Sequence, residues 1–584
     1  MTALNQSPLP QAEGSNLPAS TVLTQNLPLL AGAPNGIKKL RELILELAVR
    51  GKLVPQDPND EPASELLKRI AEEKARLVVE GKIKKQKPLA EVDETTQPFE
   101  LPVDWAWTRL GEITNFGTTT KKDEIPDDAW VLDLEDIEKD TSRLLQRTHF
   151  YERNSLSDKN SFTKGDVLYG KLRPYLNKVL VAEDDGFCTT EILPFRCHGP
   201  FVAHYFMIAL KSPYFLSYVN ARSYGMKMPR LGTEDGRQAF FPLPPLAEQH
   251  RIVAKVDELM ALCDRLEAQQ ADAESAHAQL VQALLDSLTH ASDATEFAAN
   301  WQRLAEHFHT LFTTEPSIDA LKQTLLQLAV MGKLVPQDPA DESASELLQR
   351  IQTEKQRLMA EGKLKKQKPL AAIDEDEKPY ELPPQWQWSR LGSHVIESGA
   401  GWSPSCDPRR RDGNEWGVLK VSAVSWGLYR PEENKALPAG LDPRPEHQVV
   451  EGDFLVSRAN TAELVARSVV VENTPVNLML SDKIVRLKLT SFCDRRYVNF
   501  VNSAAFAREY YGRVAAGTSS SMKNVSREQI LSLLIPLPPL TEQHRIVAKV
   551  DQLMALCDQL KTRLTKARQL NQQLASTLVE QAVA

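Results

Sequence analysis

The sequence predicts a multidomain α+β fold with a pseudo-two-fold internal repeat, in which two α/β domains are separated by long helices that pack on each other. Two observations carry this prediction. A 25-residue stretch occurs twice with only three differences, at 242–266 and 536–560. A longer stretch occurs twice without a gap and with about two-thirds identity, at 40–111 and 321–392. Self-similarity of this kind indicates a duplicated architecture.

The repeats surround two inserts, 112–241 and 393–535, which align only in a few local echoes. Two copies within one molecule meet the same environment. The repeated parts are therefore expected to have the same function in both copies, and the two inserts are expected to have different functions.

The shorter repeat predicts a helix with a heptad seam, because its apolar residues alternate steps of four and three. The seam positions are Ile252, Val256, Leu259, Cys263 and Leu266, and in the second copy Ile546, Val550, Leu553, Cys557 and Leu560. The seams are expected to continue through Ala273, Leu280 and Leu284, and through Leu564, Ala567, Leu574 and Leu578. Two long helices with matched seams most simply pack on each other.

The longer repeat predicts two helices joined by the Pro-rich turn "KLVPQDP". A lysine run follows the second helix in both copies, at Lys82, Lys84, Lys85 and Lys87 and at Lys363, Lys365, Lys366 and Lys368. Two interpretations of this run stay open, a solvated linker and a contact with phosphate or a partner.

The inserts contain short β-like runs such as "GDVLYGKLRPYLNKVLVA", "GDFLVSRANTAELVARSVVV" and "WGVLKVSAV". Each insert ends in a Gly/Ser/Met/Lys-rich loop before "LPPL". The predicted order is a flexible tail (1–35), a helical region (36–106), an α/β domain (107–246), a central spacer helix (247–290), a linker with a second helical region (291–386), a second α/β domain (387–540) and a C-terminal spacer helix (541–584).

Composition narrows the class of protein. Hydrophobic content of 42% and charged content of 25% are ordinary for a globular chain, and no apolar run approaches the length of a membrane span. The six cysteines occur singly, which favours a reducing cytoplasm. The net charge of −8 does not indicate nucleic-acid binding, but the numbers of basic and acidic residues are nearly equal within each insert. A neutral domain can still present a local basic patch.

Catalytic patterns are missing from the sequence. It has no phosphate-binding P-loop, dinucleotide fingerprint, zincin motif, adenine-methyltransferase motif or nuclease pattern. The acidic cluster Asp133, Glu135, Asp136 and Glu138 is interpreted as a solvated turn in preference to a catalytic site. Cys188, Cys197, His198 and His204 have poor ligand spacing, so no metal site is predicted.

Binding patterns remain. The first insert gathers basic and aromatic residues in "GKLRPYLNK", and the second carries "DPRRRDGNEWG" and "SRAN". Arginine commonly reads guanine and asparagine reads adenine, while lysine, serine and backbone amides position phosphates. Each residue by itself is weak evidence, because a single surface arginine is commonly just solvated.

Two divergent domains, each followed by "LPPLxEQHRIVAKVD" and containing "GKLRPYLNK" or "SRAN", resemble the specificity subunit of a type I restriction-modification system. The resemblance covers nearly everything after the tail. It implies that each α/β domain is a target recognition domain for one half of a bipartite DNA sequence. It further implies that the repeated helices pack as an antiparallel coiled coil and set the distance between the two halves. It also implies that the chain is non-catalytic and has no cofactor of its own. Two adenine methyltransferase (modification) subunits with S-adenosylmethionine, and two restriction/translocase subunits with ATP and Mg²⁺, are the expected partners.

The resemblance and the basic segments together give a set of expected DNA-binding residues. These are Lys121, Lys122, Lys171, Arg173, Tyr175, Lys178, Lys227, Arg230, Arg237, Arg409, Arg410, Arg411, Lys420, Arg458, Asn460, Ser519, Ser520 and Lys523. Whether each one reads a base or clamps a phosphate stays open. The expected partner-binding residues are the seam positions Ile252, Val256, Leu259, Ile546, Val550 and Leu553.

One feature departs from the family pattern, since a long repeat precedes the first α/β domain where many members start almost directly at theirs. We expect the N-terminal copy of this repeat to pair with the C-terminal spacer helix. Two alternatives to the main interpretation are a coiled-coil scaffold without sequence-specific DNA binding, and a fused restriction-methylation enzyme, which would need the catalytic motifs that the sequence lacks.

Overall fold

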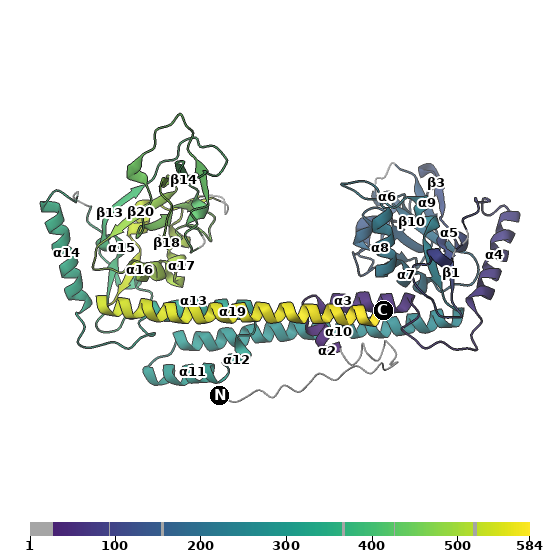
Figure 1. Cartoon of the computed structure of the whole chain (residues 1–584), viewed down its shortest axis with the longest axis horizontal. Helices are drawn as coiled ribbons and strands as arrows, with labels where there is room; N and C mark the ends of the chain where they lie inside the picture. Colours follow the sequence, from purple (N-terminus) through teal and green to yellow (C-terminus); the bar gives the residue numbers. More distant parts are fainter. Residues whose placement is uncertain are drawn as a thin grey trace. The chain divides into compact units, whose positions relative to one another are not determined.

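The computed structural model describes residues 27–90, 92, 94–153, 157–364, 368–425, 427–517 and 522–583. The chain forms two compact units. Unit 1 comprises Met1–Ala273 and Lys566–Ala584, and unit 2 comprises Glu274–Thr565 (Figure 1). The two longest helices, α10 (Leu246–Thr289) and α19 (Leu540–Val583), each contribute one segment to each unit.

Unit 1 contains an α/β domain between its repeated helices. Strand β1 (Ala106–Arg109) enters the domain and pairs antiparallel with the exit strand β11 (Phe240–Leu243). A four-stranded antiparallel sheet has the order β2 (Thr114–Asn115), β10 (Ile192–Cys197), β7 (Val167–Gly170) and β8 (Val179–Val181). A five-stranded sheet has the order β3 (Thr118–Thr120), β6 (Lys159–Phe162), β9 (Gly186–Thr189), β4 (Trp130–Leu132) and β5 (Thr148–His149). The helices are α5 (Leu110–Ile113), α6 (Phe150–Arg153), α7 (Ala203–Lys211), α8 (Pro213–Arg222) and α9 (Thr233–Gln238).

Unit 2 repeats this plan. Its entry strand β12 (Gln387–Arg390) pairs with its exit strand β22 (Leu534–Leu537). Its four-stranded sheet has the order β13 (Val395–Ala400), β20 (Ile484–Leu489), β16 (Phe454–Ser457) and β18 (Ser468–Val470). Smaller sheets are β15 (Asn434–Ala436), β14 (Gly417–Leu419) and β19 (Leu478–Met479), and β17 (Ala459–Asn460) with β21 (Lys523–Asn524). The helices are α15 (Leu391–His394), α16 (Arg495–Ser503), α17 (Ala505–Val514) and α18 (Arg527–Leu531).

The two inserts therefore share the order of their four-stranded sheets, which their sequences do not reveal. In both four-stranded sheets a strand that follows a Gly-Asp turn, β7 or β16, lies third in the order and pairs on both sides. Sheet topology depends on which strands pair across large chain separations, and burial patterns can preserve it while individual residues change.

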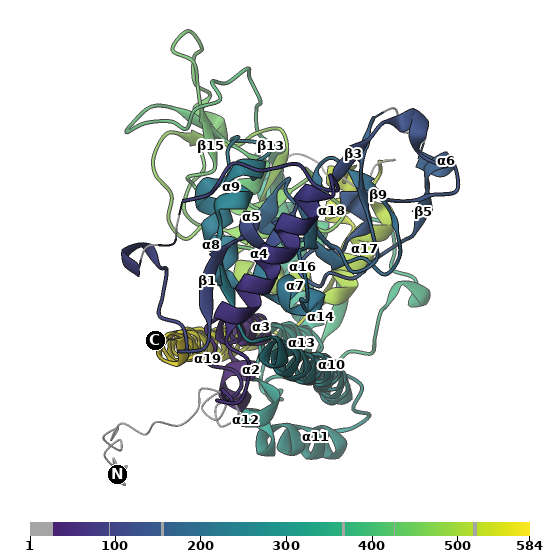
Figure 2. The ribbon, with the colours of Figure 1, turned by 90° about the vertical axis from the view of Figure 1, so that its right-hand side faces the viewer.

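The longer repeat forms two helices in each unit, as predicted. These are α3 (Gly36–Val49) and α4 (Ala63–Val79) in unit 1, and α13 (Glu315–Val330) and α14 (Ala344–Ala360) in unit 2. Helix α4 lies against α5, where the Lys74 ammonium donates to the Gly111 carbonyl at 2.9 Å (Figure 2). The central connection adds α11 (Ala294–Glu306) and α12 (Phe308–Leu311), which pack on α13 and the end of α10.

The N-terminal repeat pairs with the end of the C-terminal helix, as expected. Within unit 1 the Lys39 ammonium donates to the Ser576 hydroxyl at 2.6 Å, and Lys52 donates to the Val583 carbonyl at 2.9 Å. Ala575 is buried in the same core as α3. Unit 2 mirrors this arrangement, because Leu285 at the end of α10 is buried in one core with α13.

The first half of each predicted seam is buried, but the continuation needs correction. Ile252 and Val256 are fully enclosed in the core with α3. Further along α10, Leu280 is exposed, and the buried positions are instead Val281, Leu285 and Leu288. Similarly, Leu574 of α19 is exposed while Ala575 is buried. The buried face shifts by one residue because the 3.6-residue turn of a straight α-helix drifts away from a strict heptad.

The structure describes only the last part of the predicted flexible tail, 1–35. Residues 1–26 lie outside the described part of the chain. Helix α2 (Leu27–Gly32) follows, and Leu30 and Ala33 are buried in the unit 1 core. Burial of these apolar side chains stabilises α2 against the unit 1 core.

The predicted fold class is confirmed, with two mixed helix-and-sheet domains joined by long helices in an internally repeated chain. Among the described helices, none has both the length and the apolar composition needed to cross a membrane.

Candidate nucleic-acid interface

Each unit contains a small β-ribbon built from two segments far apart in sequence. In unit 1, Leu172 forms an antiparallel bridge with Arg230, and Arg230 bridges Tyr224. We call residues 171–173 and 224–230 the unit 1 ribbon. It joins the "GKLRPYLNK" segment to the loop that closes the insert.

The same ribbon occurs in unit 2. Strand β17 pairs antiparallel with β21, so that Asn460 lies opposite Lys523, and Asn524 bridges Ala516. We call residues 458–460, 516–517 and 522–524 the unit 2 ribbon. Both ribbons thus combine the segment after the third sheet strand with the loop before "LPPL", and the predicted binding segments come together in both units.

Three expected residues of the first insert surround a left-handed turn next to the unit 1 ribbon. Arg173 has φ 51°, and its backbone amide donates to the Pro229 carbonyl at 2.7 Å. The side chain of Arg173 is exposed. Tyr175 is also exposed, whereas Lys171 is half-buried. Arg173 and Tyr175 are therefore available for contact.

Other expected residues of this insert are held by the protein itself. The Arg230 guanidinium makes a bidentate ion pair with Glu191, with both contacts at 3.0 Å. The Lys178 ammonium donates to the Leu134 carbonyl at 2.6 Å. These contacts fix the loops, so Arg230 and Lys178 have less freedom to bind a ligand than the sequence alone suggests.

The remaining expected residues of this insert lie in three settings. Arg237 is mostly buried and its guanidinium donates to the Gln86 side chain at 3.1 Å and contacts Glu234 at 3.2 Å, so it ties α9 to the frame. Lys227 is exposed at the turn of the unit 1 ribbon. Lys121 (exposed) and Lys122 (half-buried) lie outside the ribbon.

The arginine triplet of the second insert lies on a loop between β13 and β14. Arg409 forms a bidentate pair with Glu415, at 2.6 and 3.0 Å. Arg411 donates to the Glu415 carbonyl at 2.7 Å. Arg410 is exposed and its side chain has no ion-pair partner among the described residues. Nearby, Lys420 lies 3.8 Å from Glu433.

The unit 2 ribbon contains the other expected residues of this insert. The side-chain amide of Asn460 donates to the Ser425 hydroxyl at 2.7 Å, and its oxygen accepts from the Thr461 amide at 2.9 Å. Lys523 donates to the Gly517 carbonyl at 2.6 Å. Arg458 is half-buried, and its backbone bonds Lys483 and Val525. Ser519 and Ser520 lie outside the described residues.

The structure adds one residue that the sequence interpretation missed, Arg467. The Gly170 amide bonds the Lys178 carbonyl at 2.9 Å in unit 1, and the Ser457 amide bonds the Arg467 carbonyl at 2.8 Å in unit 2. Arg467 therefore occupies the position of Lys178. The intervening loop is longer in unit 2, which hides the equivalence from a residue-by-residue comparison.

A second arginine, Arg508, lies near Arg467 in the folded domain. Its guanidinium donates to the Val465 carbonyl, and burial together with the positive charge of Arg467 lowers its pKa to about 10. Burial also lowers the pKa of Arg467. Two cations held together increase the positive potential beside the unit 2 ribbon.

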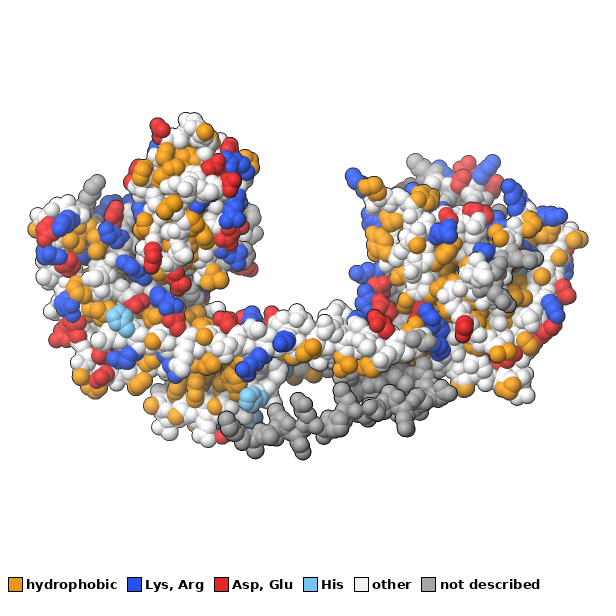
Figure 3. All heavy atoms as spheres, in the orientation of Figure 1, with side chains coloured by type: hydrophobic (Ala, Val, Ile, Leu, Met, Phe, Trp, Pro, Cys, Tyr) orange, Lys and Arg blue, Asp and Glu red, His pale blue; other side chains and the backbone are white. Residues whose placement is uncertain are grey.

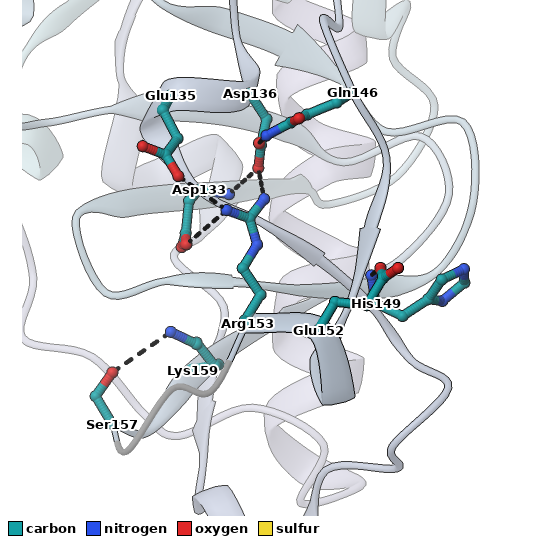
Figure 4. A network of polar contacts seen from close by, with 9 residues as sticks. All are labelled: Asp133, Glu135, Asp136, Gln146, His149, Glu152, Arg153, Ser157 and Lys159. Atoms are coloured by element: carbon teal, nitrogen blue, oxygen red, sulfur yellow. Dashed lines mark hydrogen bonds and ion pairs between the residues drawn. The ribbon is translucent and has the colours of Figure 1, made fainter.

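The acidic cluster of the first insert is structural, which corrects its interpretation as a solvated turn. Arg153 lies among three carboxylates, with contacts to Asp133 at 3.2 Å, to Glu135 at 3.1 Å and to the fully buried Asp136 (Figure 4). The Gln146 amide also donates to Asp136 at 2.7 Å. These carboxylates neutralise a mostly buried arginine and hold α6 against the loop after β4.

The repeated "LPPLxEQHR" stretch joins the frame to each α/β domain. At the start of α10 the Glu248 carboxylate accepts from the Trp105 indole at 2.9 Å and from the Gln56 amide at 3.0 Å. Gln249 accepts from the Val202 amide at 3.0 Å, and Arg251 pairs with Asp60 at 2.6 Å. The motif thus contacts three segments that are distant from it in sequence, around Gln56, Trp105 and Val202.

Unit 2 repeats this junction. Glu542 accepts from the Trp386 indole at 2.9 Å and from the Gln337 amide at 3.1 Å. Gln543 accepts from the Asp494 amide at 2.8 Å. Burial raises the pKa of the Glu542 carboxyl, while the two donors oppose that shift. Near-identity of the two copies follows from this shared network.

The six seam residues expected to bind a partner are used by the chain itself. All six lie in cores formed by the chain's own helices and domains. Leu553 is half-buried, and the other five are buried: Ile252, Val256, Leu259, Ile546 and Val550. In this structure these side chains therefore pack against the chain's own residues, and their contact with a partner subunit stays a prediction.

Charged side chains of both signs and potential metal ligands are distributed as follows in the described part of the chain. On the face drawn in Figure 3, basic and acidic side chains are interspersed over each unit. Within the described segments, no group of three or more His, Cys, Asp or Glu side chains could hold a metal ion.

Comparisons with known proteins agree on one family. A family model described as the type I restriction modification DNA specificity domain matches residues 474–570. The chain is 44% identical over 566 residues to the specificity subunit of type I restriction enzyme EcoEI of Escherichia coli, with 94% of each chain covered. It is 39% identical over 578 residues to the EcoAI specificity subunit of Escherichia coli, again with 94% of each covered. A chain solved in a study of complex assembly and conformational transition of the type I R-M system has 19% identity and a TM-score of 0.50, covering 83% of this chain and 99% of its own length, which indicates a shared fold.

Proposed function

The chain belongs to the family of type I restriction enzyme specificity subunits, and we propose that its two α/β domains each bind one half of a bipartite DNA target. Its role is that of the non-catalytic DNA-specificity subunit of a restriction-modification system. The proposed target recognition domains are 107–246 and 387–540. The proposed helical regions are 36–106 and 291–386, with spacer helices at 247–290 and 541–584.

One observation carries the proposal of two half-sites. The ribbons occupy the same place in the same sheet topology, yet their side chains differ: Arg173, Lys227 and Arg230 in unit 1, but Arg458, Asn460 and Lys523 in unit 2. A shared scaffold with different side chains suits two domains that read different base sequences. A two-stranded ribbon fits the major groove, where each base pair presents a distinct pattern of donors and acceptors.

Two identical modification subunits are the proposed partners, with the duplicated outer faces of α4 and α14 as their docking surfaces. Arg76 contacts Glu73 at 2.6 Å on α4, and Arg357 contacts Glu354 at 2.7 Å on α14. Further along the chain, Lys82 contacts Glu80 and Lys363 contacts Glu361, both at 2.8 Å. Repeated exposed charges on otherwise divergent units support two copies of one partner.

The catalytic chemistry is assigned to partner subunits. S-adenosylmethionine would bind the modification subunits, and ATP and Mg²⁺ the two restriction/translocase subunits. A cytoplasmic location completes the proposal and is supported by the six cysteines, all of which are described and free.

A domain exchange tests the half-site proposal. Residues 107–246 are replaced by the corresponding domain of a relative, and methyladenine is mapped across the genome of cells that express the modification subunit with either chain. The expected result is a bipartite motif in which one half changes and the other is retained, because each domain reads its own half. Cells without the gene provide the control.

Two outcomes contradict the proposal. A change in both halves would refute independent reading by the two domains. The absence of any motif that depends on the wild-type gene would favour a scaffold that does not bind specific DNA.

A further inference from the structure

Each ribbon exposes methionine at the same structural position. In unit 1, Met226 is fully exposed and Met228 is 50% exposed. In unit 2, Met522 is 59% exposed. Single exposed apolar residues are common and need no explanation. An exposed methionine that recurs at matching positions of two domains with diverged sequences does need an explanation.

The backbone shows that the positions match. Gly225 has φ 98°, and a Cβ there would lie 3.1 Å from the Met228 carbonyl oxygen. Gly517 has φ 132°, and a Cβ there would lie 2.3 Å from the Met522 carbonyl oxygen. In each ribbon a glycine in a conformation rare for other residues thus lets the chain approach the methionine closely. In unit 1, where the whole segment 225–228 is described, this turn leaves both methionines exposed.

The surroundings favour DNA as the occupant. Lys227 lies between the two exposed methionines of unit 1, and Arg173 is held beside them through the Pro229 carbonyl. Lys523 follows Met522 directly. An apolar tip between cations complements a groove floor of base edges between two phosphate backbones. Methionine is also unbranched and adaptable, so it suits a contact with a flat apolar group.

From these observations we propose that Met226 and Met228 in one half-site, and Met522 in the other, make apolar contacts to base edges in the major groove, with the thymine 5-methyl group as their ligand. The thymine methyl is the apolar feature that the major groove offers. This inference rests on the proposed function, and it adds base-reading residues that carry no charge and no hydrogen-bond donor.

The test uses the full chain assembled with its modification subunits. The probe is a duplex carrying the bipartite motif mapped for the wild-type chain, compared with a scrambled duplex. M226S/M228S and M522S are expected to lower the ratio of specific to non-specific affinity about ten-fold. Each variant relaxes base preference in a different half of the motif. The slope of affinity against salt stays unchanged, whereas K227A lowers that slope.

Matched controls separate a base contact from a general surface effect. M359S removes an exposed methionine from α14, away from both ribbons, and is expected to leave specificity unchanged. Leucine at the three ribbon positions is expected to restore most of the specificity. Replacing thymine by uracil in one half-site should weaken the wild-type complex but not the complex of the variant that lacks methionine in that half.

Three results would contradict the proposed contact between methionine and thymine or the function on which it rests. Specificity of M226S/M228S and M522S equal to that of M359S overturns the inference. Equal sensitivity of wild type and variants to uracil overturns the thymine methyl as ligand. A wild-type chain that shows no bipartite motif contradicts the proposed function instead, so the two failures are distinguishable.

Discussion

Adjacent arginines in unit 2 have different surroundings, and this difference decides which of them can meet a ligand. The guanidinium of Arg409 is neutralised by Glu415, while that of Arg411 donates to a backbone carbonyl. Arg410 extends into solvent between them. The same distinction holds in unit 1, where Arg230 is paired with Glu191 but Arg173 is exposed. The contacts of each arginine thus show whether it stabilises the fold or is exposed and able to contact a ligand.

At this scale we expect R410A to weaken DNA binding by the assembled complex, with the slope of affinity against salt reduced by about one. The reason is that a free cation releases counterions from a phosphate when it binds. Fluorescence anisotropy with a motif duplex at several salt concentrations measures both quantities. R409A is the matched control and should change the slope less, since Glu415 already compensates its charge. Equal slopes for R410A and wild type would exclude Arg410 from phosphate contact.

Among the elements, the junction between each exit strand and its spacer helix depends on a buried carboxylate. Glu542 at the start of α19 accepts hydrogen bonds from Trp386, just before β12, and from Gln337 in the turn after α13. Burial raises the pKa of this carboxyl, so the charged form depends on its donors. The helix start is thereby locked to both the frame and the domain.

Trp386→Phe removes one donor and is expected to lower the free energy of unfolding by about 1.5–3 kcal/mol beyond the loss of ring volume, because a hydrogen bond to a charged group is lost. Trp388→Phe is the matched control. It removes a similarly buried indole whose donor reaches the Tyr380 carbonyl only at 3.4 Å. Urea denaturation of the full chain measures both variants, and an equal loss of stability in the two would show that the Glu542 bond contributes little.

For the whole molecule, duplication gives two equivalent outer helices, α4 and α14, on units whose domains differ. Arg76 and Arg357 occupy matching positions on these helices, and each contacts two carboxylates of its own helical region. Exposed ion pairs of this kind contribute little to stability, so their repetition is better explained by a shared partner.

We expect R76E and R357E each to reduce the number of bound modification subunits from two to one, and the double variant to reduce it to none, because charge reversal changes the repeated charges of the proposed docking surfaces. Native mass spectrometry of the assembled complex counts the subunits. R303E on α11, which lies outside the repeated stretches 40–111 and 321–392, should leave two bound. Retention of both subunits by the double variant would place the docking surface elsewhere.

The sequence by itself determined the duplicated frame, the two divergent domains and the first half of each helical seam. These features are local, because periodicity and self-similarity report how one element is buried along its own length. The repeated Glu, Gln and Arg of the junction were visible as a pattern, although their partners were not. The strict heptad failed at Leu280, because the buried face of a straight helix drifts, and Val281 and Leu285 are the residues that pack with α11 and α13.

Only the tertiary structure decided which strands pair and which charges are free. The common sheet order of the two inserts, the equivalence of Arg467 with Lys178, and the meeting of Asn460 with Lys523 all join residues separated by loops of different length. The pairing of Arg153 with Asp136 and the burial of Ile252 likewise depend on chain segments far away. Contacts of this kind form only when segments that are apart in sequence pack together in the folded domain. They therefore cannot be predicted from any single stretch of the sequence.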